Sequence, residues 1–512
     1  MSFNGKISLN FRAIALFLLV ILSQRAECQK GILDSTFTFR AGTVKTGDAL
    51  DIITRKTGYN FTYDSRLIDQ DKKTEMNFKQ IKLTDILNGI LKKDSLIYSV
   101  IDKYIIISHP EINSTRPADS VFADIKYITG KVIDEESAEP LPFATIALKN
   151  KGKGTVTNAN GEFGLKIMPE YLNDTLSVSF LGYSGREIPV KESFRSNLLI
   201  EMKREFISIP EIIIKNQNPA EIINRTLKSI GRNFGTTPAL MTGFYREGVM
   251  KKSELQTYSE AILEIYKSSY TAILSSDQIK VFKSRKIENV DRSDTLAIRL
   301  KAGLSTCIEL DGAKNIFDFI GNQSDYNYRM TDIVSYDDDA AYAIEFEQKE
   351  SVDLPLYRGT IFINTTDYGI LDAEFEINPK LISKMKDSFI SSASRKFNTW
   401  PTSVKYSVSY RKVNDRYFLN HVRGDLIFTS SQKRKLFRSQ FKVFFELAIT
   451  ETVLNNVERF EREELAPIHS VFSKTIKNYD PQFWGNQDFL RPEDNLIQAL
   501  KKMNVKLQEF TE

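Results

Sequence analysis

Hydrophobic and polar residues alternate over long stretches of the chain after residue 206, with a period of two residues. This is the pattern of strands that bury one face. The clearest stretches are residues 242–250, 341–348, 357–364, 369–377, 403–412, 417–430 and 438–447. Short polar turns, such as residues 366–369 and 414–415, join them. The pattern therefore predicts a large curved antiparallel sheet within residues 207–512.

Two helices are predicted beside this sheet. Asn218 can cap a helix that has Pro219 at its first position. Residues 380–396 form a second candidate helix, and residues 209–215 are predicted as a strand that leaves the preceding region. The apolar side of the first helix would consist of Ala220, Ile222, Ile223, Leu227 and Ile230.

Shorter alternating strands fill residues 127–203, separated by clusters of Gly, Pro, Asn and Asp. Residues 139–142 (EPLP) predict a turn before a strand at 143–148, and residues 158–161 (NANG) predict a tight turn in which Gly161 takes a positive φ. Phe163, Leu165 and Ile167 would point inward. The spacing predicts a small antiparallel sandwich.

Residues 35–110 contain both the two-residue period of strands and the helical period of about 3.6 residues. They therefore predict a small α+β unit. Residues 46–57 are amphipathic and end before Gly58, and Thr84 or Asp85 can cap a second helix. Strands are predicted at 36–40, 60–63 and 74–79, followed by a hairpin of 97–101 and 104–108. The second helix would bury Ile86, Leu87, Ile90 and Leu91. Residues 111–126 read as a polar linker.

The first 28 residues have the three-part layout of a secretory signal peptide. Lys6 and Arg12 precede the apolar run 13–22, and cleavage is expected before Gln29. Lipid attachment at Cys28 is the alternative, although Glu27 is unusual for a lipoprotein signal. We therefore expect an exported protein of the periplasm or the outer membrane. After cleavage Cys307 remains, so an internal disulfide framework is excluded.

The charge is nearly balanced, at +4 with 27% charged residues and no basic block. A nucleic-acid partner therefore has no electrostatic basis in this sequence. The aromatic content is high, with 34 Phe and 21 Tyr. In long strands these rings usually fill a core, but they could also line a lipid cavity or a docking surface.

The sequence predicts no catalytic, cofactor-binding or metal-binding residue, and hence no enzyme. His109, His421 and His469 lack the spacing of a zinc site, and each is expected to be an ordinary surface or strand residue. Cys307 lies in an apolar segment that predicts partial burial. Residues 151–155 (KGKGT) read as a sandwich turn, and residues 337–339 (DDD) read as an acidic hairpin tip rather than a calcium loop.

Residues 35–110 resemble the short N-terminal domain shared by secretins and TonB-dependent transducers. The resemblance is carried by Ala49-Leu50, Gly58, Tyr63-Asp64 and the closing hairpin. It implies a periplasmic domain that makes protein–protein contacts, often through strand edges or helix faces.

Residues 127–203 resemble the carboxypeptidase-regulatory-like domain, an Ig-like or transthyretin-like sandwich that is widespread in Bacteroidetes envelope proteins. Asn158 departs from the pattern, because the family usually has Asp there. The resemblance implies no carboxypeptidase chemistry. The matching residues are Gly130, Val132, Asp134, Pro140-Leu141-Pro142, Ala144-Thr145, Gly154 to Thr157, Asn160-Gly161, Phe163 and Gly182-Tyr183.

The last region resembles two further groups. Residues 357–377 are similar to the repeated hairpin of outer-membrane lipoprotein carriers, whose half-open barrels hold lipid. Residues 478–496 are similar to the tail of uncharacterised Bacteroidetes proteins that begin with the regulatory-like domain. The predicted fold is thus multidomain and mainly β: an α+β domain, a sandwich, and a large sheet that could form such a half barrel.

Besides a hydrolase, which would need clustered carboxylates or a histidine-bearing cleft, three functions remain open at this point. The first is a non-enzymatic envelope protein that binds or assembles other envelope components, possible partners being TonB-system or outer-membrane proteins. The second is a carrier of lipid or another hydrophobic ligand, with residues 380–396 as a lid. The third is a TonB-linked transducer component without its own barrel, because a 22-stranded barrel with its plug needs well over ~500 residues, at about 10 per strand plus loops.

Overall fold

The computed structural model describes residues 32–475 apart from 64–67, 69–71, 92–95, 102–103, 109–125, 195–197, 206, 208–217, 253, 273–274, 289–297, 301–302, 338, 386–387, 393–396 and 433–437. The predictions for the signal peptide with Cys28, for His109, for nearly all of the linker, and for residues 209–215 and 478–496 lie outside these residues. The chain forms two compact units, Met1–Ala118 and Asp119–Glu512. In the described part, no helix has both the length and the apolar character that crossing a bilayer requires.

The first unit is an α+β fold, as predicted. Strands β1 (Thr36–Lys45) and β3 (Lys73–Lys82) pair antiparallel, and β2 (Asn60–Tyr63), β5 (Tyr104–Ser108) and β4 (Ile97–Ile101) form a three-stranded sheet in that order. Helix α2 (Thr46–Thr57) ends at Gly58, whose φ of 73° is left-handed. Helix α3 (Leu83–Leu91) buries the predicted apolar stripe. It begins at Leu83, so the predicted cap at Thr84 or Asp85 is wrong. The Thr84 hydroxyl instead donates to the Leu33 carbonyl at 3.0 Å.

The second unit begins with the predicted sandwich. Asn158 Oδ1 accepts the N–H groups of Asn160 and Glu162 at 2.9 Å each, and Gly161 has a φ of 74°. A Cβ at Gly161 would lie 2.5 Å from the Val132 carbonyl oxygen, so this tight turn needs glycine. One sheet has the order β12-β10-β7-β8 and the other β13-β6-β9. The strands are β6 (Lys126–Asp134), β7 (Thr145–Leu148), β8 (Gly154–Val156), β9 (Glu162–Ile167), β10 (Thr175–Ser179), β12 (Arg186–Pro189) and β13 (Leu198–Met202).

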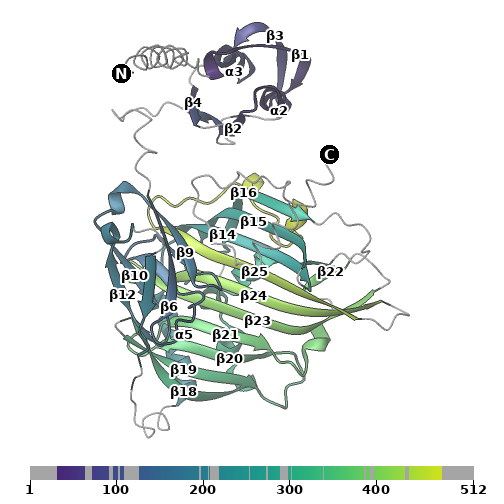
Figure 1. The fold of residues 1–512 in the computed structure, drawn as a ribbon. Helices are drawn as coiled ribbons and strands as arrows, with labels where there is room; N and C mark the ends of the chain where they lie inside the picture. The colour runs from purple at the N-terminus through teal and green to yellow at the C-terminus, as the bar shows by residue number, and fades with distance from the viewer. Residues whose placement is uncertain are drawn as a thin grey trace, which may run out of the picture. The chain divides into compact units, whose positions relative to one another are not determined.

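An eleven-stranded sheet makes up most of the second unit (Figure 1). All seven predicted strands are present, and the structure lengthens most of them. The short strand β11 (Tyr183–Ser184) comes from the sandwich and pairs parallel with β18, so the two modules share one sheet. The remaining strands, in spatial order, are β18 (Tyr326–Asp337), β19 (Asp339–Gln348), β20 (Tyr357–Asn364), β21 (Ile370–Ile377), β23 (Phe397–Val413), β24 (Arg416–Gln432), β25 (Arg438–Val453), β14 (Ala239–Lys251), β15 (Glu254–Lys267) and β16 (Gln278–Glu288).

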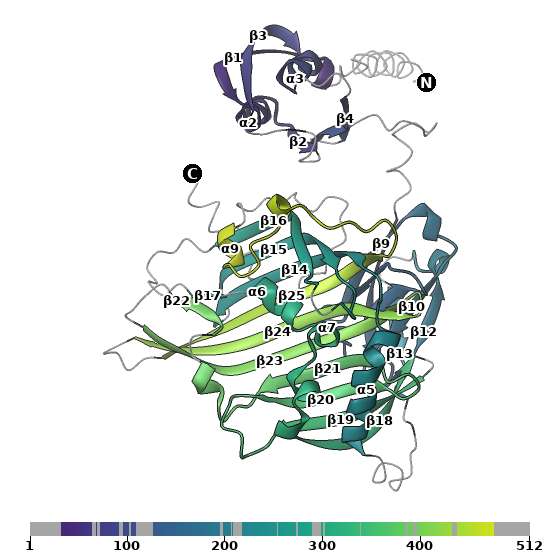
Figure 2. The same ribbon diagram turned by 180° about the vertical axis from the view of Figure 1, so that it is seen from behind.

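Helices lie over one face of this sheet, which we call the helix face (Figure 2). Helix α5 (Pro219–Asn233) starts as predicted, because the Asn218 side chain accepts the Ala220 N–H at 3.1 Å. Its buried side includes Ile222, Ile223 and Ile230. Leu227 is 36% exposed, so its place on the predicted apolar side is wrong. The short helices α6 (Gly303–Glu309), α7 (Gly312–Asn315) and α8 (Asp318–Gly321) complete the layer.

The predicted helix at 380–396 is wrong. The structure has a short 3-10 turn at Ile382–Met385 and a strand, β22 (Ile390–Ser392), which pairs with β17 (Ile298–Leu300). Only Ile382 of the turn is buried, so one helical turn is enough to place its apolar side chain in the core. A β-branched residue followed by serines then favours strand pairing over a longer helix.

Aromatic side chains fill the space between the helices and the sheet. The Phe319 ring stacks on Phe346 with 3.8 Å between centroids and on Phe317 with 4.8 Å. Phe234, at the end of α5, contacts the rings of Tyr410 and Tyr417 at 5.3 and 5.5 Å. The helix face is thus a packed core in which side chains touch across the layer.

Replacement of Phe319 tests this packing. Phe319→Ala should lower the free energy of unfolding by about 3–5 kcal/mol, because the side chain is fully buried and its removal leaves a cavity. Denaturant unfolding followed by circular dichroism measures the change. Phe282→Ala is the control, since Phe282 is 47% exposed and should cost far less. Equal losses in both variants would contradict a packed helix face.

Candidate functional site

The face of the sheet opposite the helices carries a continuous row of polar residues, one on every strand from β18 to β16. Each member lies directly opposite the next across a strand pair, so all of them point to the same side. We call this set the polar row. Its members, in order, are Arg329, Glu345, Thr360, Glu374, Ser407, Arg423, Glu446, Arg246, Glu260 and Arg285.

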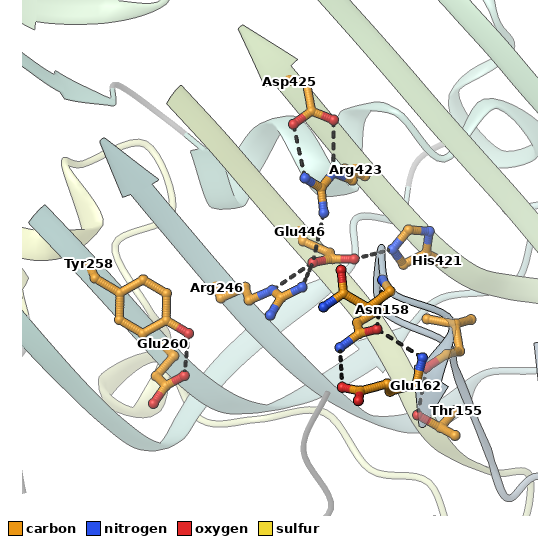
Figure 3. A network of polar contacts seen from close by, with 12 residues as sticks. Thr155, Asn158, Glu162, Arg246, Tyr258, Glu260, His421, Arg423, Asp425 and Glu446 are labelled. Atoms are coloured by element: carbon orange, nitrogen blue, oxygen red, sulfur yellow. Dashed lines mark hydrogen bonds and ion pairs between the residues drawn. The ribbon is translucent and has the colours of Figure 1, made fainter. Parts of the chain in front are cut away.

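Glu446 is the centre of the buried half of the polar row (Figure 3). Its Oε2 lies 2.6 Å from Arg246 Nη2 and 3.5 Å from Arg423 Nη1, and its Oε1 lies 2.7 Å from His421 Nε2. Burial alone would raise the pKa of Glu446. The Arg246 and Arg423 guanidinium groups, together with His421, hold that pKa well below its ordinary value. The carboxylate is therefore ionised and serves as a fixed anchor for three side chains.

Phe143 of the sandwich contacts this cluster directly. Its ring stacks on the His421 ring, with 5.0 Å between centroids, and the Arg423 guanidinium lies 5.2 Å above it. Phe143 has a φ of 61°, which is uncommon for a residue with a bulky side chain. The predicted strand at 143–148 accordingly begins at Thr145 in the structure. The left-handed backbone directs the ring away from the sandwich and onto the sheet.

A second contact joins the loop just before β8 to strands β25 and β23 of the large sheet. The Thr452 N–H donates to the Gly152 carbonyl at 3.0 Å, and Arg411 Nη2 donates to the same carbonyl at 2.5 Å. A Cβ at Gly152 would lie 1.9 Å from the Thr452 carbonyl oxygen, so only glycine permits this approach. Together with the Asn420 amide, which donates to Thr145 Oγ1 at 2.9 Å, these contacts fix the sandwich on the sheet.

The other half of the polar row is open to solvent. It lies in a groove of about 740 Å³ that crosses β18 to β24 and ends at Phe143. We call it the open groove. Its charged side chains pair along the surface: Arg329 with Glu345 at 2.5 Å, and Arg423 with Asp425 at 2.8 Å. Arg358 likewise donates twice to Glu376. The groove thus presents charged hydrogen-bond donors and acceptors side by side.

A buried charge network lies on the helix face. Lys267 Nζ lies 2.6 Å from carboxylate oxygens of both Asp277 and Asp311, and the Tyr410 hydroxyl donates to Asp311 at 3.0 Å. The three charged side chains are at most 3% exposed. Desolvation lowers the pKa of Lys267, but the two carboxylates outweigh it and raise that pKa overall. These buried ion pairs hold the start of α7 to the sheet. Because the charged groups are buried, a substrate in solvent does not reach them.

Glu247 is a buried carboxyl group of a different kind. It accepts a hydrogen bond from the Tyr245 hydroxyl at 2.7 Å and another from the Ser473 backbone, and its other close neighbours are Gly303 and Cys307. Burial raises the pKa of Glu247 to about 7. Below that pH the carboxyl group is neutral, and it joins β14 to the short helix α9 (Phe472–Thr475).

The residues that the sequence singled out are distributed over several elements. His421 is a strand residue, but it is buried and bonded to Glu446 rather than at the surface, while His469 is exposed. Cys307 is fully rather than partly buried, in α6, and burial raises its pKa well above the ordinary value. Asp337 and Asp339 flank the β18–β19 turn, as an acidic hairpin tip should. Within the described ranges, no three His, Cys, Asp or Glu residues come close enough to hold a metal ion.

The sequence alone did not predict the polar row. Its members alternate with apolar residues and therefore read as ordinary solvent-facing positions of strands. Cross-strand register decides which of them meet, and this register depends on turns and bulges far apart in the chain. A weak signal exists in the charged residues placed at the middle of several long strands, such as Arg246, Arg423 and Glu446.

Comparison with known proteins gives three matches. The family model of the CarboxypepD_reg-like domain matches residues 128–214. A TonB-dependent receptor, P39 of Formosa agariphila, is 29% identical over 87 residues, which are 17% of this chain and 8% of the receptor, so the chain spans only a small part of that relative. A crystal structure of a DUF1329 family protein from Desulfovibrio piger aligns over 49% of this chain and 100% of its own, with 11% identity and a TM-score of 0.24.

Removal of Arg246 tests the anchor. Arg246→Met should lower the free energy of unfolding by about 3–5 kcal/mol, because Glu446 then stays buried without its main partner. Denaturant unfolding measures this. Adding Glu446→Leu should recover part of the loss, since no buried charge is then left unpaired. Arg329→Met is the matched control on the exposed half, where an ion pair contributes about 0–1 kcal/mol. A fully additive double variant would contradict the anchor.

Glu247 should make the stability of the protein depend on pH. Its folded-state pKa of about 7 lies above the ordinary 4.5, so its contribution is complete below about pH 4.5 and is lost as the pH rises through 7. The loss should approach about 3 kcal/mol at pH 8. Glu247→Gln should flatten this slope in unfolding curves measured from pH 5 to 8. Glu254→Gln, at an exposed strand end, should leave the slope unchanged.

The family model that matches residues 128–214 identifies the sandwich as a carboxypeptidase-regulatory-like domain. The protein that contains it is multidomain and mainly β.

Proposed function

We propose that the protein is a non-enzymatic binding or assembly protein of the cell envelope, in the periplasm or associated with the outer membrane. It contacts other envelope proteins through its N-terminal modules and through the large sheet. The similarity of 87 residues to a TonB-dependent receptor supports an envelope setting. A TonB-linked transducer component is one form that this proposal can take.

The open groove is the observation that carries the proposal. A regulatory-like sandwich covers half of the polar row, and the contacts of Phe143, Gly152 and Asn420 hold it there. The other half presents the same chemistry to solvent over several strands, each about 4.8 Å from the next. Six strands at that spacing make the surface roughly 24 Å wide, and polar, solvent-accessible groups are typical of the rim of a protein interface.

The buried ionisable groups described above favour binding over catalysis. Glu446 is paired with three side chains, and Lys267 is paired with two carboxylates. Glu247 and Cys307, whose raised pKa values would suit chemistry, are buried in the packed core of the helix face. A catalytic group needs access to substrate, and these groups have none.

A carrier of a hydrophobic ligand is the second candidate. One observation favours it: a groove of about 820 Å³ beside α5, lined by Leu227, Ile230, Ile308, Ile316 and Ile468 among others. The aromatic packing of the helix face opposes a lipid cavity inside the sheet. Mass spectrometry of lipid that co-purifies with the protein, compared between wild type and Leu227→Asp, tests the carrier directly.

Charge reversal in the open groove tests the docking function. Arg358→Glu places like charges beside Glu376 and opposite any acceptor-rich partner, so cross-linking to envelope proteins in intact cells should fall several-fold. The cross-linked proteins are identified and counted by mass spectrometry. Lys228→Glu, an exposed residue of α5, is the matched control and should keep them. Equal recovery from both variants, or no envelope protein cross-linked to the wild type, would refute the proposal.

A further inference from the structure

A cleft of about 510 Å³ lies where the sandwich meets the hairpin ends of the large sheet. We call it the junction cleft. The sandwich contributes Thr145, Asn150 and Ser179 to its lining, and the sheet contributes Tyr336, Asn364 and Arg411. Clefts between two modules are frequent places for small ligands, because each module supplies part of the lining.

Arg411 distinguishes this cleft from the other grooves. The residue is 4% exposed, and its Nη1 and Nη2 donate to the backbone carbonyls of Lys151 and Gly152 at 3.3 and 2.5 Å. Its Nε has no hydrogen-bond partner in the part of the chain that the structure describes. Buried guanidinium groups are normally paired with a carboxylate or another anion, because an uncompensated charge in a low-dielectric site is costly.

Several charged residues near Arg411 have partners of their own. Lys149 pairs with Glu187, and Lys412 lies 3.0 Å from Asp367. Asp339 accepts hydrogen bonds from the Ala340 N–H and the Asn364 amide, at 2.9 Å each. Desolvation lowers the pKa of Arg411 to about 10, and Tyr336 and Glu451 offset only part of that effect. Glu451 in turn lies 3.9 Å from Lys153.

We propose that the junction cleft binds a small oxyanion, a carboxylate or a phosphate, through Arg411. One anionic oxygen accepts the Nε donor, and the Asn150 amide and the Tyr336 hydroxyl lie in the same lining for the remaining oxygens. Asp337 also lines the cleft, so a small ligand that carries hydrogen-bond donors fits better than a dense polyanion. This site is separate from the open groove and does not depend on docking of a partner.

Equilibrium binding of two probes, acetate and inorganic phosphate, tests the site on the full chain. Isothermal titration at constant ionic strength, with sodium chloride as the balancing salt, should show saturable binding of one anion per chain for at least one probe. Arg411→Lys keeps the positive charge but loses the planar donor, so affinity should fall by about 10- to 100-fold, the usual range for a charge-assisted hydrogen bond.

Controls separate a ligand role from a purely structural one. Lys228→Met, at an exposed position of α5 outside both the open groove and the junction cleft, should bind the probe as the wild type does. Arg411→Met should fold cooperatively and bind neither probe; if it fails to fold, Arg411→Lys carries the test. The melting temperature gives a second readout, since a bound anion should raise it in the wild type and not in Arg411→Met. Absence of saturable binding to the wild type, or equal binding by the Arg411 variants, would overturn the proposal.

Discussion

The arrangement of this protein depends on the pairing of one buried carboxylate, Glu446. An ionised carboxylate loses its hydration when it is buried, and only close opposite charges and hydrogen bonds compensate. Arg246 supplies an opposite charge from β14. Arg423 supplies a second charge from β24, and His421 on the same strand supplies a hydrogen-bonding partner. A slip of one residue in either strand would move these side chains to the helix face. The carboxylate therefore fixes the register of three strands and, through His421, the place where Phe143 stacks.

The two faces of the large sheet follow from this constraint. The helix face is filled by rings such as Phe319 and Phe346, which exclude water and stabilise the fold. The opposite face carries the polar row from β18 to β16, and the sandwich closes part of that face. Phe143 takes a left-handed backbone to reach that face, at a cost of about 1–3 kcal/mol, which its contacts with His421 and Arg423 offset.

Both proposed binding surfaces lie where the sandwich ends. The open groove begins at Phe143, on one side of the sandwich, and the junction cleft lies at the hairpin ends on another. Arg411 lines the cleft while its guanidinium donates to the Gly152 carbonyl, which also accepts the Thr452 N–H. A regulatory-like sandwich can thus form a groove and a cleft by covering part of a larger surface.

The sequence by itself determined the local elements. Alternation located the long strands, Asn218 and Pro219 set the start of α5, and Gly161 marked a turn that needs positive φ, because each of these depends on neighbouring residues alone. It failed at 380–396, where pairing of β22 with β17 decided the conformation, and at Leu227, which faces solvent.

Only the tertiary structure decided that Arg246, His421, Arg423 and Glu446 meet and that Arg411 lines a cleft. The physical reason is that these contacts join residues 200 or more positions apart in the chain. A local sequence pattern contains no information about which two strands become neighbours in the sheet.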